Sequence, residues 1–222
     1  MTIAAILIIA GGHSRRMGQP KALLTLPSGK TLLSHHVDCA KRLNLPILVG
    51  DNDKFAHALI RENDKNCDDC ANNVAFIKDY IKDAGALSCL LGAMNHYAQL
   101  SKQVPDGYIL AVSCDSLIDI DKLYVRFERA ICSQTNQDVY YLFDTIADKD
   151  YPLLGAYRLS LMSELQAYLA QGERAVMKFL KDKRCQKILM PKAWVSCANF
   201  NTPQEFAQAL QDFALIEQDN QK

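Results

Sequence analysis

The sequence is marked first by what it lacks. Its 222 residues include no apolar run near the roughly 20 residues that a bilayer-spanning helix needs. Its 25 Lys and Arg residues are matched by 25 Asp and Glu residues, so it has no basic excess to attract nucleic acid or an anionic membrane. The apolar stretch Ile3 to Ala10 has no basic start and runs into Gly-Gly-His-Ser-Arg-Arg, unlike a signal peptide. We therefore expect no membrane and no nucleic-acid partner.

Metal-binding cysteine patterns are also scarce. The chain has eight cysteines but no export signal, which indicates reduced thiols in a cytoplasmic protein. Cys67 and Cys70 have zinc-knuckle spacing, yet no second C-x-x-C follows, so we expect free thiols there. His35 and His36 fall on a predicted helix. We expect one ring to face the core and the other solvent, with no metal ligation.

The apolar pattern that is present predicts an α/β protein. Apolar, β-branched runs alternate with segments of helical periodicity, which favours one domain over residues 1–222 with a doubly wound, mostly parallel sheet. Near the end of the chain, Thr202, Pro203 and Glu205 form a capping-box pattern that opens a helix. Strands are predicted over residues 3–10, 46–50, 74–79, 107–115, 139–143 and 152–158, and further helices after Thr31 and over 86–100, 120–132 and 161–169.

A glycine loop with fixed positive charge follows the first predicted strand. Gly11 and Gly12 allow backbone N–H groups to approach an anion closely, and Arg15, Arg16 and Lys21 add positive charge. These features indicate a nucleoside triphosphate site at the carboxyl edge of the sheet. The spacing matches neither G-x-x-x-x-G-K-[ST] nor G-x-G-x-x-G, so neither a P-loop kinase nor a dinucleotide enzyme is indicated. The alternative is an ordinary glycine turn with solvated basic residues.

A carboxylate ends another predicted central strand. Asp115 lies at the same sheet edge as the glycine loop, where it could hold Mg²⁺ against a triphosphate. An isolated aspartate in this position more often caps the following turn or helix. The glycine loop at the same edge favours the metal-binding interpretation.

The chain resembles the molybdenum cofactor guanylyltransferases, the MobA family. That family opens with L-A-G-G-x-S-x-R-M-G-x-x-K-x-L-L, and residues 9–24 here read IAGGHSRRMGQPKALL. Matches to later family segments run in order over the whole chain. They are Asp79, GALSCLLGAM, SCDS, YPLLGAYR, QGERAVMKFL and NFNTPQEF.

The resemblance implies a Rossmann-like nucleotidyltransferase that transfers GMP from GTP to Mo-molybdopterin and releases pyrophosphate. An N-terminal part would bind GTP and a C-terminal part the pterin, with Mg²⁺ as cofactor. Molybdenum-insertion proteins and molybdoenzyme chaperones are further partners that it suggests. Carried over by position, Lys21, Asp115 and Arg16 are catalytic, Asp115 is the metal ligand, and Asn199 and Asn201 face the pterin. The implied GTP contacts are Ile9, Ala10, Gly11, Gly12, Lys21, Asn52, Asp79 and Asp115.

The chain departs from the family pattern at three positions near the nucleotide. Ala86 and Leu117 stand where the family has proline, and Cys89 where glycine is common. These departures leave open a second hypothesis, a non-catalytic homologue that binds nucleotide or pterin. A third hypothesis is a related transferase that uses CTP or acts on a sugar phosphate.

Overall fold

The computed structural model describes residues 1–11, 15–52, 54–55, 73–101, 106–133 and 136–219. Its strands are β1 Ile3–Ile9, β2 Ile47–Gly50, β3 Val74–Ile77, β4 Tyr108–Ser113, β5 Val139–Asp144, β6 Lys149–Arg158 and β7 Cys185–Leu189. Its α-helices are α1 Leu32–Lys41, α3 Ala86–Leu100, α4 Ile120–Ser133, α5 Met162–Ala170, α6 Val176–Leu180 and α7 Pro203–Asp219. Short 3-10 turns include η1 Arg15–Met17, η2 Lys21–Leu23 and η5 Lys192–Trp194.

All seven strands form one sheet, in the order β3-β2-β1-β4-β6-β5-β7. β1 pairs parallel with β2 and with β4, β2 pairs parallel with β3, and β5 pairs parallel with β7. β6 runs antiparallel to both of its neighbours, β4 and β5. The predicted α/β fold with a mostly parallel sheet is confirmed.

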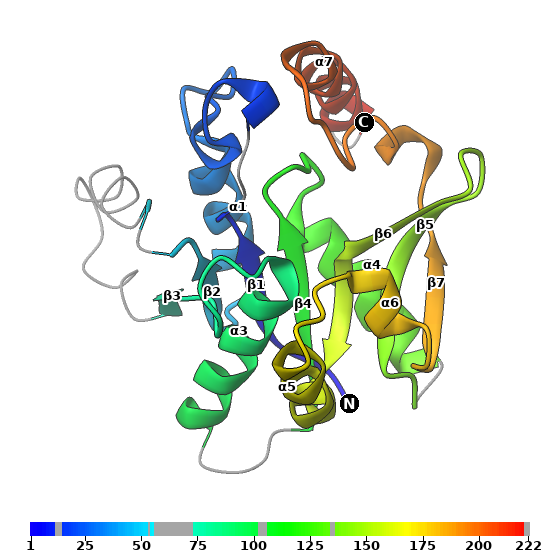
Figure 1. Ribbon diagram of the computed structural model, residues 1–222. Coiled ribbons are helices and arrows are strands. Elements are labelled where there is room, and N and C mark those ends of the chain that lie inside the picture. The colour runs from blue at the N-terminus through cyan, green and yellow to red at the C-terminus, as the bar shows by residue number, and fades with distance from the viewer. Residues whose placement is uncertain (12–14, 53, 56–72, 102–105, 134–135, 220–222) are drawn as a thin grey trace.

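Helices cover both faces of this sheet, as Figure 1 shows. Side chains alternate along β1, so Ile6 and Ile8 pack in the layer that includes residues of α1, α4 and α7. Ala5 and Leu7 pack in the other layer, with residues of α3, α5 and α6. Because β1 and β4 are buried on both faces, they are continuous apolar runs, the pattern from which they were predicted.

Local capping explains where two of the helices begin. The Thr31 hydroxyl accepts a hydrogen bond from the Ser34 amide at 3.2 Å, at the start of α1. At α7, the Thr202 hydroxyl accepts from the Glu205 amide at 3.2 Å, and Glu205 accepts from the Thr202 amide at 3.2 Å. Glu205 also accepts from the amide of Asn201 at 2.5 Å. The predicted capping box is confirmed, and it fixes the backbone of Asn201 as well.

Part of the second half of the sheet was not predicted. β7 and α6 have no counterpart among the expected elements, and β6 begins at Lys149 rather than at Pro152. β7 is short and lies at the edge of the sheet, and none of its residues is fully buried, so its sequence has no continuous apolar run. The pairing of β5 with β6 shifts register after Tyr141, which places a bulge near Pro152.

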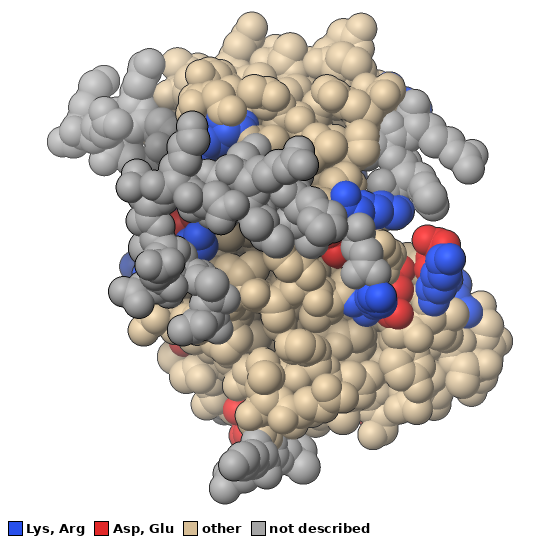
Figure 2. All heavy atoms as spheres, turned by 90° about the vertical axis from the view of Figure 1, so that its left-hand side faces the viewer, with Lys and Arg blue, Asp and Glu red and all other residues tan. Residues whose placement is uncertain are grey.

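The left-hand side of Figure 1 faces the viewer in Figure 2, where charged side chains of both signs lie next to one another. Within the described ranges, this face carries no broad patch of a single sign. Among the described residues, no helix is long and apolar enough to cross a membrane.

Tight packing between β2 and α3 explains one departure from the family pattern. A Cβ built on Gly50 would lie 2.0 Å from Sγ of Cys89, far inside contact distance. The Cys89 side chain, 2% exposed, thus occupies the space that Gly50 leaves open. The same Cβ would lie 3.7 Å from Cβ of Cys89, which is an ordinary contact. Of the atoms near Gly50, only the sulfur of Cys89 would clash with a Cβ at this position.

We predict that Gly50→Ala lowers the free energy of unfolding by about 1–3 kcal/mol, because the new methyl group overpacks the site. In a Cys89→Ala background, Gly50→Ala should lower the free energy of unfolding by clearly less, because the sulfur atom is no longer there to clash with the new methyl group. Urea unfolding of the two single variants and the double variant measures this coupling. An equal cost of Gly50→Ala in both backgrounds would contradict the packing argument.

Candidate active site

A cavity of about 350 Å³ opens at the carboxyl ends of the central strands. Backbone from the ends of β1, β2 and β4 forms its floor, and the segment before α7 reaches it from the far part of the chain. Its lining includes Ile9, Ala10, Gly11, Arg16, Lys21, Gly50, Asn52, Asp79, Ala86, Cys89, Asp115, Leu153 and Asn201. This is the sheet edge at which ligands bind in open α/β sheets.

The first wall of the cavity is the backbone after β1. The amide of Ala10 donates to the carbonyl of Gly50 at 2.9 Å, and the carbonyl of Ile9 accepts from Cys114 at 3.0 Å. These bonds continue the sheet up to the cavity and hold the start of the glycine loop. A Cβ on Gly11 would lie 3.4 Å from Nδ2 of Asn52, an ordinary contact, which shows that the Asn52 side chain lies next to this glycine. Gly12 lies outside the described residues.

A second wall is formed by Asn52 and Asp79, which are joined by two hydrogen bonds. Nδ2 of Asn52 donates to Oδ2 of Asp79 at 3.0 Å, and the Asp79 amide donates to Oδ1 of Asn52 at 2.8 Å. Asn52 has φ +54°, a left-handed conformation that asparagine tolerates better than most residues. Burial raises the pKa of Asp79, and the hydrogen bond from Asn52 opposes that rise only in part.

A third wall contains the charged centre of the cavity. Nζ of Lys21 donates to Oδ1 of Asn201 at 3.0 Å and lies 3.6 Å from Oδ2 of Asp115. Nδ2 of Asn201 in turn donates to Oδ1 of Asn199 at 2.7 Å. The side chains of Lys21 and Asp115 are 14% and 26% exposed, so the pair is sheltered but reachable. One cation thus connects the turn after β1, the loop after β4 and the segment before α7.

Backbone hydrogen bonds hold the last two of these segments together. The Phe200 amide donates to the carbonyl of Asp115 at 3.0 Å, and the Leu117 amide donates to the carbonyl of Cys197 at 2.8 Å. The Ser116 hydroxyl also donates to Cys197, at 3.2 Å. A proline in place of Leu117 would have no N–H for this bond. The departure at Leu117 therefore adds a link beside Asp115.

The structure brings most of the sequence-predicted site residues to one cavity. Asn199 is linked to it through Asn201, and Arg16 lines it from η1 with an exposed side chain. Sequence reasoning missed Leu153, which reaches the cavity from the bulged part of β6. It also missed Asp83, whose φ of +55° marks a turn before α3. Neither residue carries a motif, because both positions depend on non-local folding.

Cys67 and Cys70 lie outside the described residues. The six cysteines that the structure describes are Cys39, Cys89, Cys114, Cys132, Cys185 and Cys197, and all are free.

The fold is that of a nucleotidyltransferase of Rossmann-like architecture, with Arg16, Lys21 and Asp115 gathered at the carboxyl edge of its mostly parallel sheet. A family model described as a MobA-like NTP transferase domain matches residues 6–186, and the chain belongs to this family.

Named relatives span nearly the whole chain. A molybdenum cofactor guanylyltransferase of Vibrio cholerae is 26% identical over 204 residues, covering 91% of this chain and 89% of the relative. One of Haemophilus influenzae is 28% identical over 211 residues, covering 91% and 94%. Among solved structures, molybdopterin-guanine dinucleotide biosynthesis protein A from Archaeoglobus fulgidus has a TM-score of 0.67 at 21% identity, covering 93% of this chain and 97% of that one. That structure supports the fold.

The raised pKa of Asp79 predicts a pH-dependent cost to stability. Its folded-state pKa lies above the unfolded value, so the folded chain binds more protons between the two values. Stability therefore falls as pH rises from the ordinary range of an aspartate through the folded pKa, and at neutral pH the ionised side chain is destabilising. Asp79→Asn removes this cost, while its amide oxygen still accepts from Asn52.

Urea unfolding at about pH 4 and pH 7 measures the effect. Relative to the wild type, the free energy of unfolding of Asp79→Asn should be higher at about pH 7 than at about pH 4. A difference that is the same at both pH values would show that Asp79 does not titrate as expected.

Proposed function

We propose that this protein transfers GMP from GTP to Mo-molybdopterin, giving molybdopterin guanine dinucleotide and pyrophosphate. The single observation that carries the proposal is the Lys21 ammonium group between Asp115 and Asn201. It joins the residues proposed to bind GTP to those proposed to bind the pterin. The names of the curated relatives supply the identity of the two substrates.

The roles of the cavity residues follow from their chemistry. Backbone at Ile9, Ala10 and Gly11 would lie along the nucleotide, with Gly12 continuing the loop. Asp79, oriented by Asn52, would hold the nucleoside, since a fixed carboxylate accepts hydrogen bonds from ring N–H or ribose hydroxyl groups.

Arg16 and Lys21 are proposed to stabilise the triphosphate. Arginine can bind two oxygens at once, whereas the lysine ammonium group acts as a point charge that can follow the leaving group. Asn199 and Asn201, paired with each other, would position the pterin on the other side of Lys21.

The proposed reaction needs no general base. The terminal phosphate of the pterin is already ionised, and one of its oxygens forms a bond to the α-phosphorus of GTP. The bond between the α-phosphorus and the α,β-bridging oxygen breaks, and its electron pair leaves with pyrophosphate. Lys21 and Arg16 would accelerate the transfer by positioning the phosphates and stabilising the negative charge on them.

Asp115 fits a magnesium site by its chemistry and its place. Its carboxylate lies at the cavity edge with 26% of the side chain exposed, beside the lysine proposed to contact phosphate. Oxygen ligands of this kind suit Mg²⁺, which when bound supplies neutralisation of the triphosphate charge. Asp115 would hold the ion, and Lys21 would retain its contact with Asn201.

We further propose that the chain acts as a single nucleotidyltransferase domain over residues 1–222. Its N-terminal part would bind GTP and its C-terminal part the pterin. Molybdenum-insertion proteins would deliver the pterin substrate and molybdoenzyme chaperones would receive the product, in the cytoplasm.

A panel of nucleotides tests the proposed function. The purified protein is incubated with Mg²⁺, molybdopterin and one of GTP, CTP, ATP or UTP, and pyrophosphate release is measured. Of the four nucleotides, we expect only GTP to give pyrophosphate release, and we expect no release when molybdopterin is left out. Pyrophosphate release with CTP would show instead that the protein transfers CMP. Nucleotide binding without any release would favour the non-catalytic reading.

We predict that Lys21→Ala and Asp115→Ala each reduce turnover by about a hundredfold or more, because each removes charge placed at the reacting phosphates. Circular dichroism should show that both variants keep their fold. Lys30→Ala is the matched control, since Lys30 pairs with Asp38 on the surface at 2.6 Å, away from the cavity lining. Near-normal turnover of Asp115→Ala would refute its assignment as the metal ligand.

A further inference from the structure

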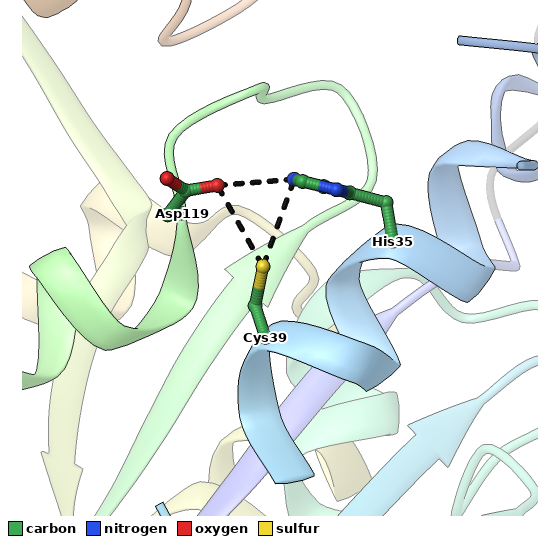
Figure 3. Close-up of side chains that lie close together, drawn as sticks. All are labelled: His35, Cys39 and Asp119. Carbon is green, nitrogen blue, oxygen red and sulfur yellow. Dashed lines mark hydrogen bonds and ion pairs between the residues drawn. The ribbon is translucent and has the colours of Figure 1, made fainter. Parts of the chain in front are cut away.

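Three side chains outside the active site converge on one point between α1 and α4. His35 and Cys39 lie four residues apart on α1, so they share a helix face, and Asp119 directly precedes α4. Figure 3 shows all three side chains pointing toward one another. None of them lines the cavity described above. Of the two neighbouring histidines, His36 is fully buried, as expected for one ring, whereas the His35 side chain is 20% exposed and is directed at Asp119.

The distances between the three ligand atoms form a compact triangle. Nε2 of His35 and Oδ1 of Asp119 are 3.0 Å apart, Sγ of Cys39 and Nε2 are 3.7 Å apart, and Sγ and Oδ1 are 3.6 Å apart. In a tetrahedral zinc site, ordinary bond lengths place nitrogen and oxygen about 3.3 Å apart and sulfur about 3.5 Å from either. The triangle therefore matches one face of a zinc coordination tetrahedron to within a few tenths of an ångström.

The surroundings of this triangle hold its ligand atoms in place. The second oxygen of Asp119 is held by Lys122 at 3.0 Å, which leaves Oδ1 directed at His35 and Cys39. The Phe213 ring of α7 stands edge-on to His35, with centroids 5.7 Å apart. A histidine–aspartate pair would need no thiol, yet Cys39, 2% exposed, contacts both partners. Nitrogen, thiolate and carboxylate together are a donor set that suits zinc.

We propose that His35, Cys39 and Asp119 form a zinc-binding site with a fourth coordination position open to water. Binding replaces the two hydrogen bonds that Asp119 Oδ1 accepts. The thiol proton of Cys39 is released to solvent, and the neutral imidazole of His35 carries its proton on Nδ1, so that Nε2 presents its lone pair to the ion. The site differs from the magnesium site proposed at Asp115, because a thiolate is a soft ligand and Mg²⁺ prefers oxygen.

A zinc ion here would link α1 to the loop that carries Asp115. Asp119 ends that loop, and Nε2 of the neighbouring His36 donates to the carbonyl of Ser116 at 2.9 Å. The ion and this hydrogen bond would hold both ends of the segment from Ser116 to Asp119 against one helix. With three protein ligands, the ion should be exchangeable and removable by a chelator.

Cobalt(II) substitution tests the site on the full chain. The protein is treated with a chelator, dialysed and titrated with Co²⁺, and the thiolate-to-cobalt charge-transfer absorption is followed. We expect one equivalent of Co²⁺ to produce this band and one equivalent of Zn²⁺ to abolish it. Cys39→Ser and His35→Gln should each weaken Zn²⁺ binding by at least about a hundredfold.

Two control variants separate this site from other metal ligands. A Cys67→Ser/Cys70→Ser double variant and Asp115→Ala should both retain the band. Zn²⁺ should also raise the melting temperature of the wild type but not of Cys39→Ser. Circular dichroism shows whether Cys39→Ser and His35→Gln are folded, and the retention of full Co²⁺ absorption in either folded variant would overturn the proposal. Absence of the band in the wild type, or its loss in the Cys67→Ser/Cys70→Ser protein, would do the same.

Discussion

The geometry of the candidate active site depends on the contacts that the ammonium group of Lys21 makes with Asp115 and Asn201. This group lies between an aspartate carboxylate and an asparagine carbonyl oxygen, with its side chain only 14% exposed. A sheltered charge is stable only when such partners replace water. The two partners come from the loop after β4 and the segment before α7, which are also joined by backbone hydrogen bonds at Asp115 and Leu117. The loop after β4 and the segment before α7 are thereby fixed relative to each other and to Lys21.

Much of this arrangement could be predicted from the sequence. Buried parallel strands are apolar on both faces, so β1 and β4 were evident as continuous runs, and the carboxyl edge of the sheet followed from them. The glycine loop and Asp115 then fell at that edge by spacing alone. The resemblance to a family added Asn199 and Asn201, which no local pattern indicates. The resemblance also implied Asn52 as a GTP contact, but its pairing with Asp79 is visible only in the structure.

The features that the sequence did not reveal are those set by non-local packing. The reversed direction of β6 and the edge strand β7 depend on which strands pair, and neither leaves a strong periodic pattern. Leu153 reaches the cavity because of a bulge, not because of a motif. The convergence of Asp119 on His35 and Cys39 spans 84 residues for the histidine, so a helix pattern alone gave no reason to connect them.

The separation of Lys21 from Asn201 by 180 residues also has a consequence for biosynthesis. A ribosome-bound chain that has exposed residues 1–115 already contains β1 to β4, the glycine loop, Asp79 and Asp115. It still lacks the oxygen that accepts the hydrogen bond from the lysine, and the capping box that fixes Asn201 is made only when residue 205 emerges. The centre of the active site is therefore among the last parts of the fold to assemble. A stalled or prematurely terminated chain would carry most of the lining of this cavity without the asparagine side chain that completes it.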